Sequence, residues 1–249
     1  MKVRTVCSTL ISLILGLGML QVAQAEEIHG LASIALQGTS DIVRDYERKT
    51  GNKVIIEWLP AVEITQRLKA GATPDFVFNP SKSVDDFIQS GVLLSDGRLE
   101  IVQSGIGIGV PRGTPKRTIA TMEDLKQALL SAKSIVYATG PSGDHIESLI
   151  KQMGIGEQIK GKIKISTGFV GKDIEKGMGD IGFQQIPEIM LVPGIDLLGP
   201  LPPDCQKMTP FSIAVVASSK HAKTSKEFFK FLKNPALSPE YKKHGLDPL

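Results

Sequence analysis

The sequence predicts an α/β fold with two lobes, each built on a helix-covered, mostly parallel sheet. Three observations lead to this prediction. Short β-rich apolar runs alternate with amphipathic helical patterns, as they do in parallel sheets covered by helices. The alternation stops near residue 100 and starts again at Thr121. Two long extended stretches, residues 100–110 and 208–217, can each carry the chain from one lobe to the other.

The first block of elements occupies residues 28–91. Its expected strands are residues 28–32, 53–58 and 76–78, with a short helix at residues 64–70. Ser40 is expected to cap the first helix and Gly51 to end it. Ser83, followed by Asp86, is typical of a capping-box variant at the start of the third helix.

The second block is expected to begin with a helix that Thr121 caps. Its further elements are strands at residues 134–138, 163–165 and 181–183 and a helix at residues 144–153. After the second extended stretch come a helix with Phe228 and Leu232 on its apolar stripe and a short helix near Tyr241. We therefore divide the mature chain into a first part of lobe 1 (residues 26–109), lobe 2 (residues 110–208) and a return to lobe 1 (residues 209–249).

The N-terminus has the pattern of a cleaved export signal. Lys2 and Arg4 precede an apolar run at residues 10–20, and Ala23-Gln24-Ala25 supplies a small-x-small cleavage site. The apolar run is shorter than the ~20 residues that a membrane-spanning helix needs. We expect signal peptidase to cut after Ala25 and leave a periplasmic protein. Because that compartment lacks ATP and holds little NAD(P)H, nucleotide-driven enzymes and most dehydrogenases are disfavoured.

Charge and composition disfavour several partners and cofactors. The chain has 29 Lys and Arg against 26 Asp and Glu, so loss of Lys2 and Arg4 leaves it nearly neutral. No nucleic-acid partner is expected, because the basic residues are dispersed and three Tyr and one Trp offer few stacking surfaces. The four histidines and Cys205 lack metal-ligand spacing, and no basic neighbour activates the Cys205 thiol. We expect a monomer without metal or cofactor.

The turns between strands and helices are the most informative places for function. In open parallel sheets, ligands bind at the carboxyl ends of strands, where helix N-termini present free N–H groups. Four turns qualify, at residues 32–34, 60–62, 79–82 and 139–145. The last is rich in hydroxyls and glycines, so its backbone and Ser142 can approach a ligand closely. An ordinary helix start, capped by Ser142 or Asp144, fits the same spacing equally well.

The candidate ligand-binding residues come from these turns, from a further strand end and from an isolated cation. They are Ser33, Asn79, Ser81, Lys82, Arg112, Thr139, Ser142, Gly143, Gln184 and Gln185. Lys82 and Arg112 could neutralise an anion, although a lone surface cation is more often only solvated. Gln184 and Gln185 could donate neutral hydrogen bonds or be ordinary surface residues. His145 is the candidate proton carrier if the protein is an enzyme, and it fits a helix surface as well.

Four segments share a family pattern. They are residues 53–82 with GATPDFVF at 71–78, GDIGFQQ at 179–185, VPGID at 192–196 and the Phe-rich tail at 222–249. Together they resemble the molybdate-binding-protein-like branch of periplasmic solute-binding proteins, over nearly the whole mature chain. The resemblance implies the type 2 periplasmic-binding-protein fold, with a ligand cleft between the lobes, hinge-like closure and a permease partner in the inner membrane.

The chain departs from the molybdate binders at two turns. The resemblance implies oxyanion-binding serines after the first and second strands. Here Ser33 is displaced by one position, and Pro60-Ala61-Val62 has no hydroxyl. A shift of one residue on a strand turns the side chain to the other face. A small organic carboxylate, which hydroxyl, amide and backbone donors with one or two cations suit, is therefore favoured over molybdate or tungstate.

Three functions remain open. The leading one is a periplasmic solute-binding protein that captures a small anionic solute for an ABC importer. The second is a cofactor-independent isomerase on the same scaffold, because relatives in this branch include aconitate isomerase, which moves a proton within an unsaturated tricarboxylate. Its acid or base would be His145 or a carboxylate in the cleft. The third is an exported sensory or chaperone-like module that binds a partner protein through apolar residues at the cleft rim.

Overall fold

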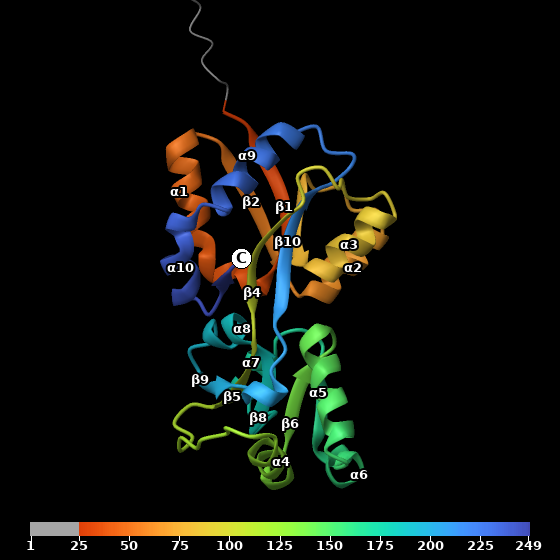
Figure 1. The fold of residues 1–249 in the computed structure, drawn as a ribbon, viewed down its shortest axis with the longest axis vertical. Coiled ribbons are helices and arrows are strands. Elements are labelled where there is room, and N and C mark those ends of the chain that lie inside the picture. Colours follow the sequence, from red (N-terminus) through yellow and green to blue (C-terminus); the bar gives the residue numbers. More distant parts are fainter. Residues whose placement is uncertain (1–24) are drawn as a thin grey trace, which may run out of the picture.

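The computed structural model describes residues 25–249, so the predicted export signal, apart from Ala25, lies outside the described residues. Two lobes are stacked along the long axis of the molecule (Figure 1). Each lobe is built on one sheet, and the two sheets share no strand. The predicted α/β class with two helix-covered sheets is confirmed. The sheets are mixed rather than mostly parallel, because the extended stretches that carry the chain between the lobes pair antiparallel with their neighbours.

The sheet of the first lobe contains both ends of the described chain. Its strands are β1 (Glu27–Ser33), β2 (Lys53–Leu59), β3 (Phe76–Pro80), β4 (Leu99–Ser104), β10 (Thr209–Val215) and β11 (Asp247–Pro248). They are ordered β11-β4-β10-β3-β1-β2. β1 is parallel to β2 and β3, whereas β10 is antiparallel to β3 and β4. The carboxyl ends of the three parallel strands therefore meet at one edge of the sheet, the edge that faces the second lobe.

Helices cover both faces of this sheet (Figure 1). They are η1 (Ile34–Thr39), α1 (Ser40–Thr50), α2 (Ala61–Lys69), α3 (Ser81–Gln89), α9 (Ala222–Leu232), η4 (Pro235–Leu237) and α10 (Ser238–Lys243). The core on the α1 and α9 face is aromatic, with ring centroids 5.0 Å apart for Tyr46 and Phe228 and 5.6 Å apart for Phe76 and Phe228. Full burial of such a side chain stabilises a fold by about 1.5–3 kcal/mol.

The sheet of the second lobe is formed by the middle of the chain. Its strands are β5 (Ile106–Pro111), β6 (Ile135–Ala138), β7 (Ile163–Ser166), β8 (Ile181–Gln185) and β9 (Ile195–Pro200), in the order β7-β6-β8-β5-β9. Its helices are α4 (Met122–Ser131), α5 (Pro141–Gln152), α6 (Gly156–Ile159), η2 (Lys160–Lys162), α7 (Val170–Glu175), α8 (Ile186–Met190) and η3 (Pro203–Cys205). β6 is parallel to β7 and β8, so these strands also end at one edge.

The chain passes between the two sheets twice. Only Gly105 separates β4 from β5, so the single extended stretch predicted at residues 100–110 is in fact divided between the sheets. The chain therefore changes sheet just before Ile106, whereas the predicted boundary between the lobes follows residue 109. The division into lobes at residues 109 and 208 stays a prediction. The two crossing segments are hydrogen-bonded to each other through Gln206, which precedes β10, and Ile106, which begins β5. The Gln206 Oε1 accepts from the Ile106 N–H at 2.8 Å, and its Nε2 donates to the Ile106 carbonyl at 3.0 Å.

Most helix boundaries follow the expected local chemistry. Gly51 ends α1 in the left-handed conformation, with φ of 78°. The predicted cap of α4 is confirmed, because the Thr121 hydroxyl accepts from the Asp124 N–H at 3.1 Å. The predicted cap of α1 is wrong: Ser40 is the first residue of that helix, and its hydroxyl donates to the Gln37 carbonyl at 2.5 Å.

The start of α3 also differs from the prediction. The helix begins directly after Pro80, so the expected capping box of Ser83 and Asp86 does not form. The Ser83 hydroxyl instead accepts from Nδ2 of Asn79 at 3.2 Å, and Asp86 pairs with Lys82 at 3.0 Å. Proline at the last strand position fixes a backbone angle that suits the residue before a helix, which overrides the weaker signal of the serine. Within residues 25–249, no helix is both long and apolar enough to span a membrane.

Candidate functional site

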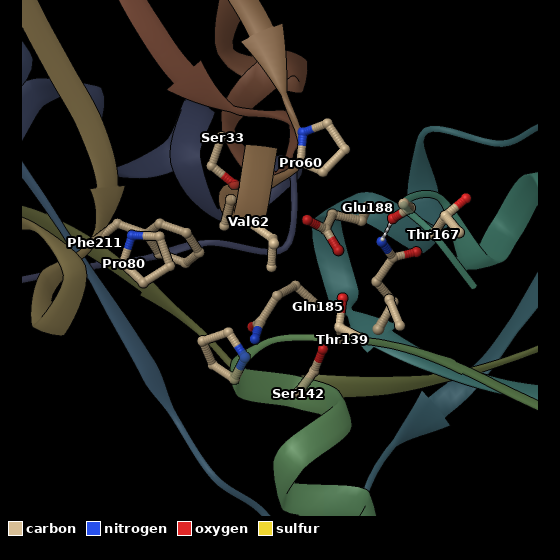
Figure 2. A pocket seen from close by; sticks show the side chains of 15 residues that line it. Ser33, Pro60, Val62, Pro80, Thr139, Ser142, Thr167, Gln185, Glu188 and Phe211 are labelled. Atoms are coloured by element: carbon tan, nitrogen blue, oxygen red, sulfur yellow. Dashed lines mark hydrogen bonds between the residues drawn. The ribbon is translucent and has the colours of Figure 1, made fainter. Parts of the chain in front are cut away.

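A cleft between the lobes is enclosed by the ends of the parallel strands. It contains about 490 Å³ of space not filled by atoms, including its mouth. The first lobe contributes the ends of β1, β2 and β3, and the second lobe contributes the start of α5, the segment before α7 and the start of α8 (Figure 2). Ligands of open α/β sheets bind at such strand ends. The cleft is therefore the candidate site.

Ser33 closes the end of β1 in the first lobe. Its side chain is buried, and its Oγ lies 3.4 Å from the Ala35 N–H at the start of η1. The hydroxyl hydrogen is free to point into the cleft, because this contact uses only a lone pair. Ser33 therefore presents a donor at the point where the first strand becomes a helix.

The N-terminus of α2 forms an apolar wall with free backbone donors. Pro60 precedes the helix and makes no side-chain cap, and the first N–H groups of any helix have no carbonyl partner within it. Pro60 and Val62 both face the cleft (Figure 2). An anion here would meet N–H dipoles rather than the hydroxyl of a serine.

The N-terminus of α5 approaches from the second lobe. Gly140 precedes the helix with φ of 109° and ψ of −170°, a conformation that side chains disfavour, and Pro141 is the first helical residue. Gly143 packs closely on β6, since an added Cβ would lie 1.7 Å from the Ala138 carbonyl oxygen. No side chain caps the helix, so the Ser142 hydroxyl and the first N–H groups are available to a ligand.

Two amides lie at the end of β8. Gln184 donates to the Gly168 carbonyl at 3.0 Å, and Gln185 donates to the Thr209 hydroxyl at 3.0 Å. The amide oxygens of both side chains are buried without a hydrogen-bond partner. Buried polar atoms are normally satisfied, so these two oxygens are acceptors available to a group in the cleft.

Glu188 is a cleft residue that the sequence analysis missed. It lies on α8, its side chain points into the cleft toward Val62 (Figure 2), and only 6% of the residue is exposed. Burial raises the pKa of Glu188 to about 8. Hydrogen bonds to the Gln185 backbone and the Gln184 side chain lower this pKa, but their effect is smaller than that of burial. The signal for finding it was present, because Pro187 and Glu188 lie in the first turn after a strand end, as at the other ligand-facing turns.

The cleft brings together five of the predicted site residues. They are Ser33, Thr139, Ser142, Gln184 and Gln185. Gly143 stands one position behind Ser142 in the first turn of α5. Asn79 and Lys82 line a neighbouring groove between α2 and α3, which encloses about 1240 Å³ when the open solvent at its mouth is included. The Lys82 side chain is 87% exposed.

Three other predicted residues are engaged elsewhere. The hydroxyls of Ser81 and Ser212 lie 2.7 Å apart, Arg112 donates to the Pro193 carbonyl at 3.0 Å, and His145 Nε2 lies 2.7 Å from the Cys205 carbonyl oxygen. Cys205 itself is buried, and burial raises the pKa of its thiol. His145 turns away from the cleft because it lies on the side of α5 that faces η3.

The electrostatic character of the cleft follows from this placement. Among the described lining residues there is no Lys, Arg or His, and Glu188 is the single carboxyl group. Bound negative charge would therefore depend on hydroxyls and helix N-termini rather than on an ion pair. The described residues also contain no cluster of three His, Cys, Asp or Glu side chains that could hold a metal ion.

Comparisons with known proteins match this architecture. Residues 38–247 match the family model described as bacterial extracellular solute-binding protein. The chain is 30% identical over 227 residues to an aconitate isomerase of Pseudomonas sp. The aligned region covers 88% of this chain and 87% of that protein.

Solved structures show the same fold. The periplasmic molybdate-binding protein of Azotobacter vinelandii superposes with a TM-score of 0.72 at 14% identity, over 88% of this chain and 98% of that one. The sulfate-binding protein SubI of Mycobacterium tuberculosis H37Rv superposes with a TM-score of 0.72 at 16% identity, over 90% and 87% of the two chains. The two-lobe fold and the family resemblance inferred from the sequence are confirmed. The chain belongs to the family of bacterial extracellular solute-binding proteins.

Proposed function

We propose that this protein captures a small organic carboxylate in the cleft between its lobes. The observation that carries the proposal is the convergence of donors from both lobes on one cleft: the Ser33 hydroxyl and the start of α2 on one side, and Ser142 with the start of α5 on the other. Such donors hold a carboxylate without a fixed cation. Ligand binding would then stabilise the closed arrangement of the lobes.

The chemistry of the walls favours an organic acid over a tetrahedral oxyanion. Pro60, Val62 and Phe211 offer apolar surface to a carbon skeleton, and the turn that contains Pro60 has no hydroxyl. With a pKa of about 8, Glu188 is mostly protonated at neutral pH and can donate a hydrogen bond to a ligand carboxylate. Molybdate and sulfate have no carbon skeleton to use these apolar contacts.

Differential thermal stability measures this capture directly. Purified protein is heated with di- and tricarboxylates, including citrate, cis-aconitate and trans-aconitate, and with molybdate, tungstate and sulfate. We expect at least one carboxylate to raise Tm, since a ligand that binds only the folded state stabilises it by mass action. No response to any carboxylate would overturn the proposal, and a response to oxyanions alone would replace the ligand class.

A bulky substitution tests the position of the site. Ser142→Leu is expected to weaken binding of the stabilising carboxylate at least tenfold, about 1.4 kcal/mol, because the side chain would occupy the space in front of α5. Ser95→Leu, in an exposed turn of the first lobe, is the matched control. Equal affinity in both variants would show that the ligand binds elsewhere.

Transport is the setting that we propose for capture. The protein would be exported, cleaved after Ala25, monomeric, and would deliver its solute to an ABC permease in the inner membrane. N-terminal sequencing of the exported protein should begin at Glu26, and light scattering should give the mass of one chain. A retained leader or a stable dimer would contradict these two statements.

A cofactor-independent isomerase is the second candidate function. The 30% identical relative is an aconitate isomerase, and a carboxyl group of raised pKa lies inside the cleft. We expect purified protein to change the ultraviolet absorbance of cis-aconitate or trans-aconitate until equilibrium is reached. An unchanged trace at high protein concentration would exclude this isomerase activity and leave capture as the function.

A further inference from the structure

Glu188 is an unusual group to find in a cleft for anions. In a site for carboxylates, a carboxyl group repels the ligand whenever it is ionised, and it can donate a hydrogen bond to the ligand only when it is protonated. We infer that Glu188 is the acid–base residue that moves a proton between two carbon atoms of a carboxylate held in this cleft. The inference rests on the proposed capture of a carboxylate and assigns a reaction class and a residue to the same site.

Among residues 25–249, Glu188 has no counter-ion that would make it part of a structural ion pair. The elements packed against α8 are η1, β5, β8, β9 and α7. η1, β5 and β8 contain no titratable side chain, and Asp196 on β9 accepts from the Gly113 N–H at 2.8 Å. On α7, Lys172 pairs with Glu175 at 2.9 Å, and neither these residues nor Asp173 perturbs Glu188.

The carboxyl group therefore keeps a proton that it can lose within the physiological range. Desolvation is the largest influence on its pKa, which is about 8, and its polar neighbours Gln184 and Gln185 are neutral. A general acid or base works best when its pKa lies near the working pH, because both protonation states are then populated. The site thus holds a group that can both give and accept a proton near neutral pH, whereas a hydrogen bond to a captured carboxylate requires only the protonated form.

Packing across the lobes holds Glu188 in a fixed place. α8 belongs to the second lobe but packs against η1 of the first. A Cβ added to Gly245, near the C-terminus, would lie 2.7 Å from Ile186 Cγ2 and 3.0 Å from Met190 Sδ, so both ends of α8 contact the first lobe. Closure consequently sets the carboxyl group against the ligand and excludes water from the reacting carbon.

The other candidate proton carriers are in unsuitable positions. His145 contacts the Cys205 carbonyl oxygen. The Tyr137 hydroxyl donates to Glu147 at 3.3 Å in a different pocket, and its pKa is raised to about 12. Apart from Glu188, the described lining of the cleft contains no basic side chain that could activate its hydroxyls. Glu188 is thus the described cleft residue able to accept a proton from carbon.

The reaction would be a proton shift within an unsaturated carboxylate. Ionised Glu188 takes a proton from the saturated carbon beside one ligand carboxylate, and the C–H bond breaks. The electron pair of that C–H bond forms a new double bond between the first carbon and its neighbour, the second carbon. The electron pair of the original double bond, which joined the second carbon to a third, moves to the third carbon. Protonated Glu188 then gives its proton to the third carbon. The elemental formula is unchanged, and no oxidant, reductant or metal takes part.

Proton exchange with heavy water distinguishes this role from capture. Purified protein in D₂O is mixed with cis-aconitate, trans-aconitate or itaconate, and deuterium entry at carbon is followed by proton NMR. In parallel, binding of each compound is measured by calorimetry. We expect the native protein to exchange at least one compound that it binds, and Glu188→Gln to lose about 100-fold or more of that rate. Its affinity should stay within about threefold, a factor worth less than 1 kcal/mol.

Controls separate catalysis from folding. Glu157→Gln, whose carboxyl group is 86% exposed and pairs with Lys160 in the second lobe, should exchange like the native protein. Glu188→Asp, which keeps the acid but shortens its reach, should retain more activity than Glu188→Gln. The exchange rate of the native protein should rise with pH and level off near the pKa of Glu188, and this dependence should be absent in Glu188→Gln.

The binding and exchange measurements test the capture of a carboxylate and the acid–base role of Glu188 separately. Binding of a probe without exchange by the native protein would overturn the acid–base role while leaving capture intact. Equal exchange in the native protein and in correctly folded Glu188→Gln would also overturn it. Failure of every carboxylate to bind would overturn the proposed capture, and this inference with it.

Discussion

Gly168 in the second lobe faces Pro60 in the first across the cleft, and a Cβ atom at position 168 would lie 3.2 Å from Cγ of Pro60. A similar approach occurs at Gly140, where an added Cβ would lie 3.4 Å from Cγ2 of Val62. At these two points the second lobe approaches the first through glycines, which have no side chain. A side chain at residue 168 would press on Pro60 across the cleft, because 3.2 Å is shorter than an ordinary contact between carbon atoms.

Gly168→Leu should hold the cleft open. We expect ligand affinity to fall at least tenfold, about 1.4 kcal/mol, because closed-state contacts with the first lobe are lost. The free energy of unfolding should change little, since both lobe cores are untouched. Gly161→Leu is the control, because nothing lies within 4 Å of an added Cβ there. Calorimetry and urea unfolding check both expectations, and unchanged affinity would show that closure at this point is not required.

Glu188→Gln should change how stability depends on pH. The pKa of Glu188 is raised from 4.5 to about 8 in the folded protein, so between these values the folded state binds more protons than the unfolded state. Its contribution to the free energy of unfolding is complete below pH 4.5 and falls as the pH rises toward 8, by up to about 1.4 kcal/mol per pH unit.

The measurement compares urea unfolding of the two proteins from pH 5 to pH 9. Glutamine stays neutral in both states, so the stability of Glu188→Gln relative to the native protein should increase steadily across this range and stop increasing above the folded pKa. Glu157→Gln should follow the native protein. A constant difference between Glu188→Gln and the native protein at every pH would mean that Glu188 is ionised in the folded state.

Gly140→Ala should disturb the start of α5. The backbone at Gly140 lies at φ of 109° and ψ of −170°, a region available almost only to glycine. We expect a loss of about 1–3 kcal/mol in the free energy of unfolding, together with weaker ligand binding, because the N–H groups near Ser142 would be displaced. Gly156→Ala is the control, since its added Cβ has only an ordinary contact at 3.8 Å. Equal stability of the two variants would contradict the prediction.

His145→Ala should affect stability rather than binding. Its ring nitrogen contacts the Cys205 carbonyl oxygen at 2.7 Å, and removal of one hydrogen-bond partner leaves the other unsatisfied. A loss of about 1–3 kcal/mol in unfolding free energy is expected, with unchanged affinity and unchanged proton exchange. His29→Ala, at an exposed position, serves as the control. A selective loss of exchange in His145→Ala would restore this histidine as the proton carrier.

Much of the fold could be predicted because its signals are local. Alternating strands and helices, the glycine that ends α1 and the cap at Thr121 are each encoded within a few residues. The elements that were missed are short, and they include β9 and α7 with six residues each, α8 with five and β11 with two. Such segments have too few residues to show a hydrophobic period, and their structure comes from packing against other elements.

The candidate site was predicted less completely for a related reason. Turn chemistry pointed to Ser33, Ser142 and the two glutamines, all of which line the cleft. Arg112 and His145 also have suitable chemistry, but contacts with Pro193 and Cys205, distant in the chain, hold them elsewhere. Which way a polar side chain points depends on which partner the fold brings near, and that information is not local.

The sequence by itself determined the class of the fold, the family and a set of strand-to-helix turns able to face a ligand. These features follow from residue periodicity and from caps and breakers that act within one or two turns of the chain. Only the tertiary structure decided which of those turns share one cleft, and it placed Glu188 inside that cleft with no counter-ion among the described residues. The physical reason is burial. A carboxyl group surrounded by water has an ordinary pKa, whereas the packing of two lobes around Glu188 removes the water that would keep it ionised.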